Sequence, residues 1–79
     1  MNEVFMREAL AMAVENVQSG RGGPFAALVV RGDEVVGRGT NRVTSTNDPT
    51  AHAEVVAIRE ACRHLQAFHI SGCDLYTTC

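Results

Sequence analysis

Apolar residues recur at helical intervals near the start of the chain. Intervals of three, four and seven residues bring side chains to the same side of a helix. Asn2 suits the position that caps the first turn, and Gly20 suits the position that ends a helix. The pattern predicts a helix over 2–18 with one face buried in a hydrophobic core. The apolar positions that repeat are Phe5, Ala9, Met12, Leu10, Val14 and Val17.

The next apolar segment is continuous rather than periodic. Residues 25–30 contain no polar position, which is typical of a strand buried on both faces and predicts helices above and below it. Residues 35–40 predict a second strand, and the turn residues Gly32 and Asp33 lie between the two. We therefore expect an antiparallel hairpin.

A second helical pattern follows a polar, turn-forming stretch. Asp48 and Pro49 suit a helix entrance, because aspartate caps the first turn and proline fits the first helical position. The pattern predicts a helix from about 50 to 65, and residues 74–78 predict a third strand. The apolar positions of this helix are Ala51, Val55, Ile58, Cys62 and Leu65.

Composition narrows the class of protein. Seventy-nine residues suffice for one small domain, and 46% hydrophobic with 20% charged residues is typical of a globular chain. Seven basic and nine acidic residues are interspersed, which disfavours nucleic-acid binding. The apolar runs are too short to span a bilayer, and the first residues do not have the pattern expected of a signal peptide. We expect a cytoplasmic protein without membrane attachment.

The most informative residues for chemistry are His52 and Glu54, in the first turn of the predicted helix. Residues two apart lie about 200° apart around a helix axis, so they converge only at its open N-terminal end. That end is positive and favours a bound anion such as hydroxide. On its own the pair is weak evidence, since a surface histidine beside a dipole-stabilising glutamate has the same pattern.

The surrounding residues extend this pattern. The stretch 47–54, Asn-Asp-Pro-Thr-Ala-His-Ala-Glu, resembles the first half of the motif of the cytidine deaminase-like superfamily, and 23–27 resembles the preceding strand. The resemblance is closest to bacterial guanine deaminases and covers essentially the whole chain. It implies an α/β fold, in which 1–79 is a single partial domain. This domain is the α-β-β-α-β front half of an α/β/α three-layer sandwich with a mixed sheet, truncated before the C-terminal PCxxC helix and the last strands.

The resemblance also assigns roles at the site. His52 would bind Zn²⁺ together with two downstream cysteines that this chain lacks, and Glu54 would be the catalytic acid and base. The implied reaction converts guanine to xanthine and ammonia, with a small-molecule purine base as partner and a homodimer as the full-length form. Cys79 corresponds to the residue before the PCxxC motif, so it is not a ligand.

Two further residues have two interpretations each. Asn41 stands where the family holds a substrate-binding residue, but asparagine also commonly ends strands. Phe25 could pack against the base or belong to the core. Outside the site, His64 and His69 are expected to complement the C-terminal end of the helix, and Cys62 to be a small core residue.

The function itself has competing interpretations. A tRNA adenosine deaminase or nucleoside deaminase fragment is the alternative within the superfamily, although Asn47 and the lack of a basic patch favour the guanine enzymes. A noncatalytic remnant that acts as an interaction module is the alternative outside it. In either case we expect the 79 residues alone to be inactive, because one histidine cannot hold catalytic zinc, and to self-associate through the open edge of the third strand.

Overall fold

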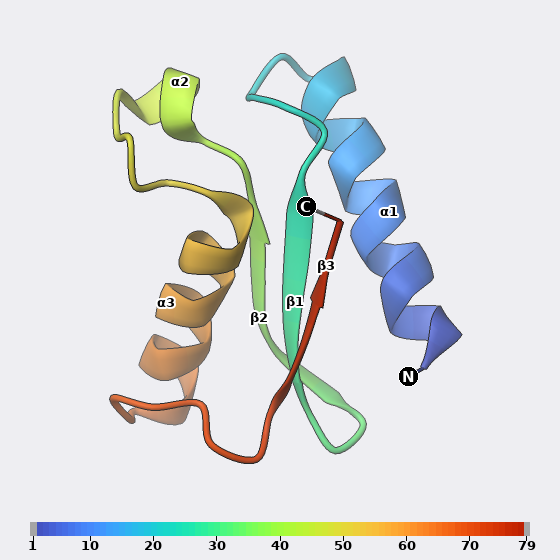
Figure 1. The fold of residues 1–79 in the computed structure, drawn as a ribbon, viewed down its shortest axis with the longest axis vertical. Helices are drawn as coiled ribbons and strands as arrows, with labels where there is room; N and C mark the ends of the chain where they lie inside the picture. Colours follow the sequence, from blue (N-terminus) through green and yellow to red (C-terminus); the bar gives the residue numbers. More distant parts are fainter. Residues whose placement is uncertain (1, 79) are drawn as a thin grey trace.

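The computed structural model describes residues 2–78, which form three layers (Figure 1). A three-stranded sheet lies in the middle, with one long helix on each face. This arrangement confirms the predicted α/β class and the order helix, strand, strand, helix, strand, to which it adds one short helix. None of the helices in the described range is long and apolar enough to cross a membrane. The elements are α1 (Glu3–Gln18), β1 (Ala26–Arg31), β2 (Glu34–Thr40), α2 (Val43–Thr46), α3 (Ala53–Leu65) and β3 (Asp74–Thr77).

The central strand is β1, which pairs with β2 on one side and β3 on the other. Its side chains are buried from Ala26 to Val30, as expected for a strand covered on both faces. Both pairings are antiparallel, with Ala26 opposite Thr40 in the hairpin and a register shift between Val29 and Val30. The predicted hairpin is confirmed. The mixed sheet implied by the resemblance has only antiparallel pairs within residues 2–78.

One face of the sheet is covered by α1. The Asn2 side chain caps the helix by accepting the Val4 N–H at 2.9 Å, and Gly20 has a φ of 76°, which suits the end of a helix. Both predicted helix ends are confirmed. The buried residues of this layer are Ala9, Leu28, Val30 and Tyr76, with Phe5, Met6, Met12 and Val35 packed around them.

The second apolar row of α1 does not belong to the core. Leu10, Val14 and Val17 are about half exposed, at 51%, 55% and 48%. The sheet contacts the side of α1 that carries Ala9, Ala13 and Asn16, because these small side chains let the helix approach closely. The prediction was therefore right for the helix and wrong for half of its buried face.

The other face of the sheet is covered by α3, which packs very closely on β2. Its buried residues are Ala53, Ala57 and Ala61, which were not predicted; of the predicted row, Ala51 is buried, and Ile58 and Leu65 are partly buried against the same core. A β-carbon at Gly37 would lie 2.4 Å from the Ala57 carbonyl oxygen, so only glycine fits there. Only small side chains fit on the helix at this distance, so alanines face the sheet. Val55 and Cys62, which were predicted to be buried, are only partly buried.

Candidate active site

The start of α3 differs from the prediction. The predicted cap was Asp48, but the residue at the cap position is His52, in extended conformation with φ −70° and ψ 152°. Its carbonyl oxygen accepts the Val56 N–H at 2.9 Å, whereas its side chain makes no capping hydrogen bond. The His52 side chain is exposed, so the imidazole is accessible to a ligand at the positive end of the helix.

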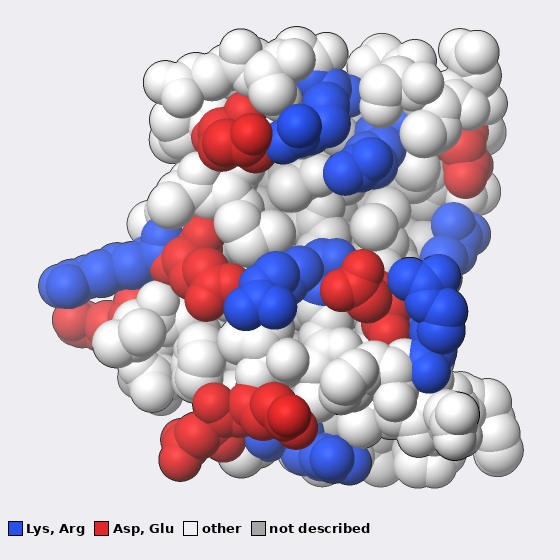
Figure 2. Space-filling model, turned by 180° about the vertical axis from the view of Figure 1, so that it is seen from behind, with Lys and Arg blue, Asp and Glu red and all other residues white. Residues whose placement is uncertain are grey.

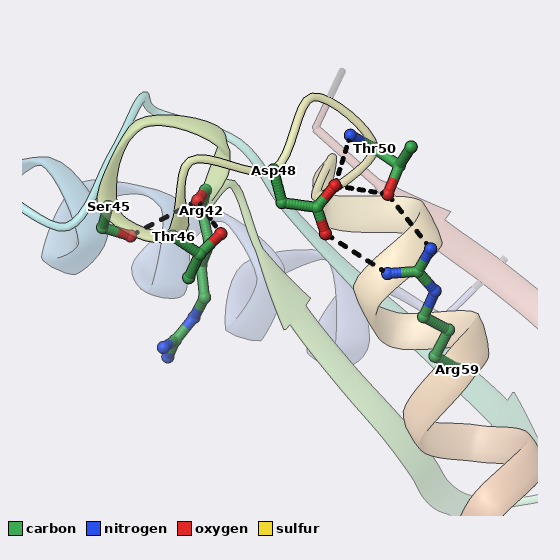
Figure 3. Close-up of polar contacts among 6 residues, drawn as sticks. All are labelled: Arg42, Ser45, Thr46, Asp48, Thr50 and Arg59. Atoms are coloured by element: carbon green, nitrogen blue, oxygen red, sulfur yellow. Dashed lines mark hydrogen bonds and ion pairs between the residues drawn. The ribbon is translucent and has the colours of Figure 1, made fainter.

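Asp48 is engaged in the loop that precedes the helix (Figure 3). Its carboxylate accepts the Thr50 hydroxyl at 2.7 Å and the Thr50 N–H at 2.9 Å. These hydrogen bonds, with a contribution from the Arg59 guanidinium 3.8 Å away, hold the pKa of Asp48 below its usual value. Arg59 also donates to the Thr50 hydroxyl at 3.1 Å, which fastens the loop to the second turn of α3.

The short helix α2 was not predicted. It ends at Asn47, whose φ of 53° is left-handed, and the Thr46 hydroxyl donates to the Arg42 carbonyl at 2.7 Å (Figure 3). Asparagine tolerates this conformation better than most residues. Asn47 before Asp48 and Pro49 is the sequence feature that marks this turn, although no apolar periodicity accompanies it.

Backbone hydrogen bonds bring three of the predicted site residues to the same end of the sheet. The Arg42 N–H donates to the Ala51 carbonyl at 2.9 Å, which places Asn41 and His52 on adjacent segments. The Asn41 N–H donates to the Phe25 carbonyl at 3.1 Å. The end of β2, the start of β1 and the start of α3 therefore meet there (Figure 1).

The two predicted base-contacting residues have different surroundings. Phe25 is 39% exposed and precedes β1, so the interpretation of Phe25 as a core residue was wrong. Asn41 is half-buried, and its Oδ1 accepts the Val43 N–H at 3.2 Å, which fits the interpretation that it ends the strand. Its side-chain Nδ2 is the group through which Asn41 can donate to a ligand.

Glu54 lies in the first turn of α3 and is partly buried. A carboxylate at this position is stabilised by the helix dipole, whatever else it does. The position of this turn is fixed by β2, because a β-carbon at Gly39 would lie 2.2 Å from the Ala53 carbonyl oxygen. Gly39 thus sets the depth at which His52 and Glu54 are held over the sheet.

The remaining histidines and cysteines of the described residues are not part of the candidate site. His64 is exposed in the last turn of α3, as expected for a residue that complements the helix dipole, and His69 is exposed after that helix. Cys62 and Cys73 are free thiols of intermediate burial, so the prediction of Cys62 as a core residue was wrong. Cys79 lies outside the described residues.

The donor set for a metal is incomplete in this part of the chain. Within residues 2–78, no group of three or more histidine, cysteine, aspartate or glutamate side chains could hold a metal ion. Catalytic zinc is normally held by three protein ligands and a water. His52 can supply one imidazole, so the residues present fit one corner of a zinc site and not the whole of it.

Acidic and basic side chains alternate over the face that carries the β2 edge (Figure 2). Arg38 pairs with Glu8 at 2.7 Å, Arg63 with Glu60 at 3.8 Å, and Arg21 with Glu15. The guanidinium groups of these arginines are therefore locally neutralised. A phosphate backbone requires a continuous basic surface, which this face lacks.

Comparison with known proteins gives a consistent result. Residues 1–79 match the family model for the cytidine and deoxycytidylate deaminase zinc-binding region. Guanine deaminase of Bacillus subtilis (strain 168) is 49% identical over 78 residues, which are 99% of this chain and 50% of that protein. Its crystal structure superposes with a TM-score of 0.96 and 50% identity, covering 100% of this chain and 51% of the other.

Two other matches widen the comparison. The tRNA-specific adenosine deaminase of Aquifex aeolicus (strain VF5) is 41% identical over 76 residues, which are 96% of this chain and 50% of that protein. A solved structure in complex with 2,6-diaminopurine is 34% identical with a TM-score of 0.85, covering 92% of this chain and 42% of the other. The chain spans about half the length of these two curated relatives.

Proposed function

Because the chain belongs to the cytidine and deoxycytidylate deaminase zinc-binding family, we propose that it provides the proton-transfer half of a hydrolytic purine deaminase that acts on guanine. The observation that carries this proposal is the position of His52. Its imidazole is exposed at the N-terminus of α3, on a segment hydrogen-bonded to the one that holds Asn41. Because these segments lie side by side, a histidine that can bind zinc, a carboxylate and a side-chain amide are found at one end of the sheet.

His52 is the zinc ligand that this chain contributes. Zinc supplies a water of lowered pKa, about 7, when the metal site is complete. Two more protein ligands are required, and the described residues do not provide them. We therefore propose that the 79 residues alone release no ammonia from guanine above the level of a His52→Ala variant.

Glu54 moves the protons of the reaction. Hydrolytic deamination adds water to the carbon that bears the amino group and expels ammonia. Glu54 accepts the first proton from the attacking water and delivers it to the ring nitrogen. It then takes the second proton, from the hydroxyl added to the ring carbon, and delivers it to the amine, which leaves as ammonia while the carbonyl forms. A carboxylate in the first turn of α3 lies close to His52 in the chain and is held there by the Gly39 contact.

Asn41 and Phe25 hold the base. Purines present ring nitrogens and carbonyl oxygens that accept hydrogen bonds, and the Asn41 Nδ2 can donate to one of them. The Phe25 ring is partly exposed at the same end of the sheet, where it can pack on a planar base. The matched structure that contains 2,6-diaminopurine supports a purine rather than a pyrimidine as the ligand.

A tRNA adenosine deaminase is the second candidate, supported by the 41% identity to the Aquifex protein. The higher identity to the Bacillus guanine deaminase and the alternating charges of Figure 2 favour the free base. Comparing ammonia release from guanine with that from an adenosine-containing anticodon stem-loop separates the two. Faster reaction of the RNA would reverse our choice.

The assay requires a complete zinc site. We define the reconstituted pair as this chain mixed, with Zn²⁺, with the half of Bacillus subtilis guanine deaminase that it does not match. We expect the pair to release ammonia from guanine and each component alone to release none. Turnover by this chain alone, above the His52→Ala control, would contradict the incomplete-site proposal. A folded, zinc-loaded pair without turnover would favour a noncatalytic interaction module.

A further inference from the structure

Asn16, in the last turn of α1, is fully buried, with 0% of its surface exposed. It is the one buried polar or charged residue in the described part of the chain. Burying an amide is costly unless its hydrogen bonds are made, so its contacts indicate what it does.

The amide nitrogen of Asn16 bonds two different segments at once. Its Nδ2 donates to the Gly23 carbonyl at 2.9 Å and to the Asn41 carbonyl at 3.0 Å. A carboxamide nitrogen carries two hydrogens, and each is used by a different segment. Gly23 lies two residues before Phe25, so the two bonds join the segments that carry both proposed base contacts.

The surrounding backbone leaves little freedom to this arrangement. A β-carbon at Gly22 would lie 2.2 Å from the Asn41 carbonyl oxygen and 3.3 Å from the Asn16 Nδ2. Asn41 is held on its other side as well, because its N–H donates to the Phe25 carbonyl at 3.1 Å. Both backbone groups of Asn41 are therefore fixed, and its side chain projects from a rigid support.

The Asn16 Oδ1 is buried without a hydrogen-bond partner among the described residues. An orphaned buried acceptor costs about 1–3 kcal/mol. The two hydrogen bonds that the Asn16 Nδ2 donates are the contacts that account for this buried side chain. The donors are thus the reason for an asparagine at this position.

We propose that Asn16 is a positioning residue that sets the spacing between Phe25 and Asn41, and thereby the fit of the purine base between them. The inference rests on the proposed function, because it takes Phe25 and Asn41 as the base contacts. Asn16 itself does not touch the base. It acts through the two carbonyl oxygens that it holds.

The test compares Asn16→Leu, which is similar in size and has no donor, with Asn16→Ser, which is smaller and has one. NMR titration of the 79-residue chain with 2,6-diaminopurine, followed at the Asn41 side-chain amide and the Phe25 ring, gives the dissociation constant. We expect it to rise about tenfold in Asn16→Leu and less in Asn16→Ser. Hydrogen exchange at the Asn41 N–H should become faster in the same order, while the His52 imidazole signal stays unchanged. If Asn16→Leu does not fold, Asn16→Ser decides the question alone.

The matched control is Tyr76→Phe, which removes the hydroxyl that accepts the Asn2 N–H at 3.0 Å at the opposite end of α1. It should lower stability without changing purine affinity. Unchanged affinity in both Asn16 variants, with wild-type binding intact, overturns the positioning role alone. An affinity loss in Tyr76→Phe equal to that in Asn16→Leu also overturns it, because stability would then explain the effect. Failure of the wild-type chain to show purine shifts at Asn41 and Phe25 overturns the proposed base contacts, and this inference with them.

Discussion

Replacing Gly39 by alanine should displace the start of α3 from the sheet. The new β-carbon would lie 2.2 Å from the Ala53 carbonyl oxygen and 2.4 Å from the Ala57 backbone nitrogen. Ordinary contact distances between such atoms are about 3.5 Å, so the helix and the strand must separate by roughly 1 Å. Overpacking a core costs about 1–3 kcal/mol, and two backbone contacts place this variant at the upper end, near 3 kcal/mol.

Urea unfolding followed by circular dichroism measures this loss in the free energy of unfolding. The matched control is Gly32→Ala at the hairpin tip, where φ is +64° and no atom lies within 4 Å of the added carbon. Its cost is backbone strain alone, about 1 kcal/mol. We expect Gly39→Ala to lose about 2 kcal/mol more than the control, with shifted amide signals at Asn41 and His52. Equal losses with unchanged signals would refute the close-packing argument.

Three other predictions test the loop and the sheet edge. Because the pKa of Asp48 is lowered in the folded chain, its carboxylate stabilises the fold above the ordinary pKa of 3.8, and this contribution is lost as the pH falls through the lower folded value. NMR titration of Asp48 should give a midpoint below 3.8, and Thr50→Val should raise that midpoint. Arg59→Met should speed hydrogen exchange over 47–51 but change the free energy of unfolding by less than about 1 kcal/mol, because the ion pair between Arg59 and Asp48 is exposed. A larger loss of stability would mean that the loop stabilises the whole fold. Leu75→Lys should shift the chain toward monomer in sedimentation, because Leu75 is 43% exposed on β3, which within residues 2–78 pairs with β1 alone; an unchanged oligomer would place the contact elsewhere.

The strands and their order could be predicted because their sequence patterns are local. The continuous apolar run 25–30 indicated a strand covered on both faces, and the turn at Gly32 and Asp33 indicated the hairpin. The ends of α1 were predictable for the same reason, since Asn2 and Gly20 act within one turn of the helix. Each of these features depends on residues close together in the chain.

The buried faces of the helices were harder to predict, because they depend on what the sheet presents. Gly37 and Gly39 leave β2 without side chains where it lies closest to α3, so alanines fit against it there and larger residues of the helix are only partly buried. The prediction assumed that the larger apolar residues are the buried ones, and on this helix that assumption was wrong. On α1 the same preference for small side chains leaves Leu10, Val14 and Val17 partly exposed.

The sequence named the residues proposed for the site, but it did not predict how the chain positions them. Helix-capping preferences selected Asp48, whereas the loop uses that carboxylate for Thr50 and the helix begins after His52. Asn16 was missed entirely, because its partners are seven and twenty-five residues away and no local pattern marks them. The part of the site that sequence could not reveal is the part held by long-range contacts.

The central claim is that this chain contributes the proton-transfer residue of a purine deaminase. The measurement that tests it most directly is zinc-dependent ammonia release from guanine by the reconstituted pair carrying Glu54→Gln, compared with Glu60→Gln on the same helix, where Glu60 pairs with Arg63. We predict that Glu54→Gln lowers the rate about 10²- to 10⁴-fold with zinc content unchanged, and that Glu60→Gln has the wild-type rate. A Glu54→Gln pair that binds zinc and deaminates guanine at the wild-type rate would contradict the account.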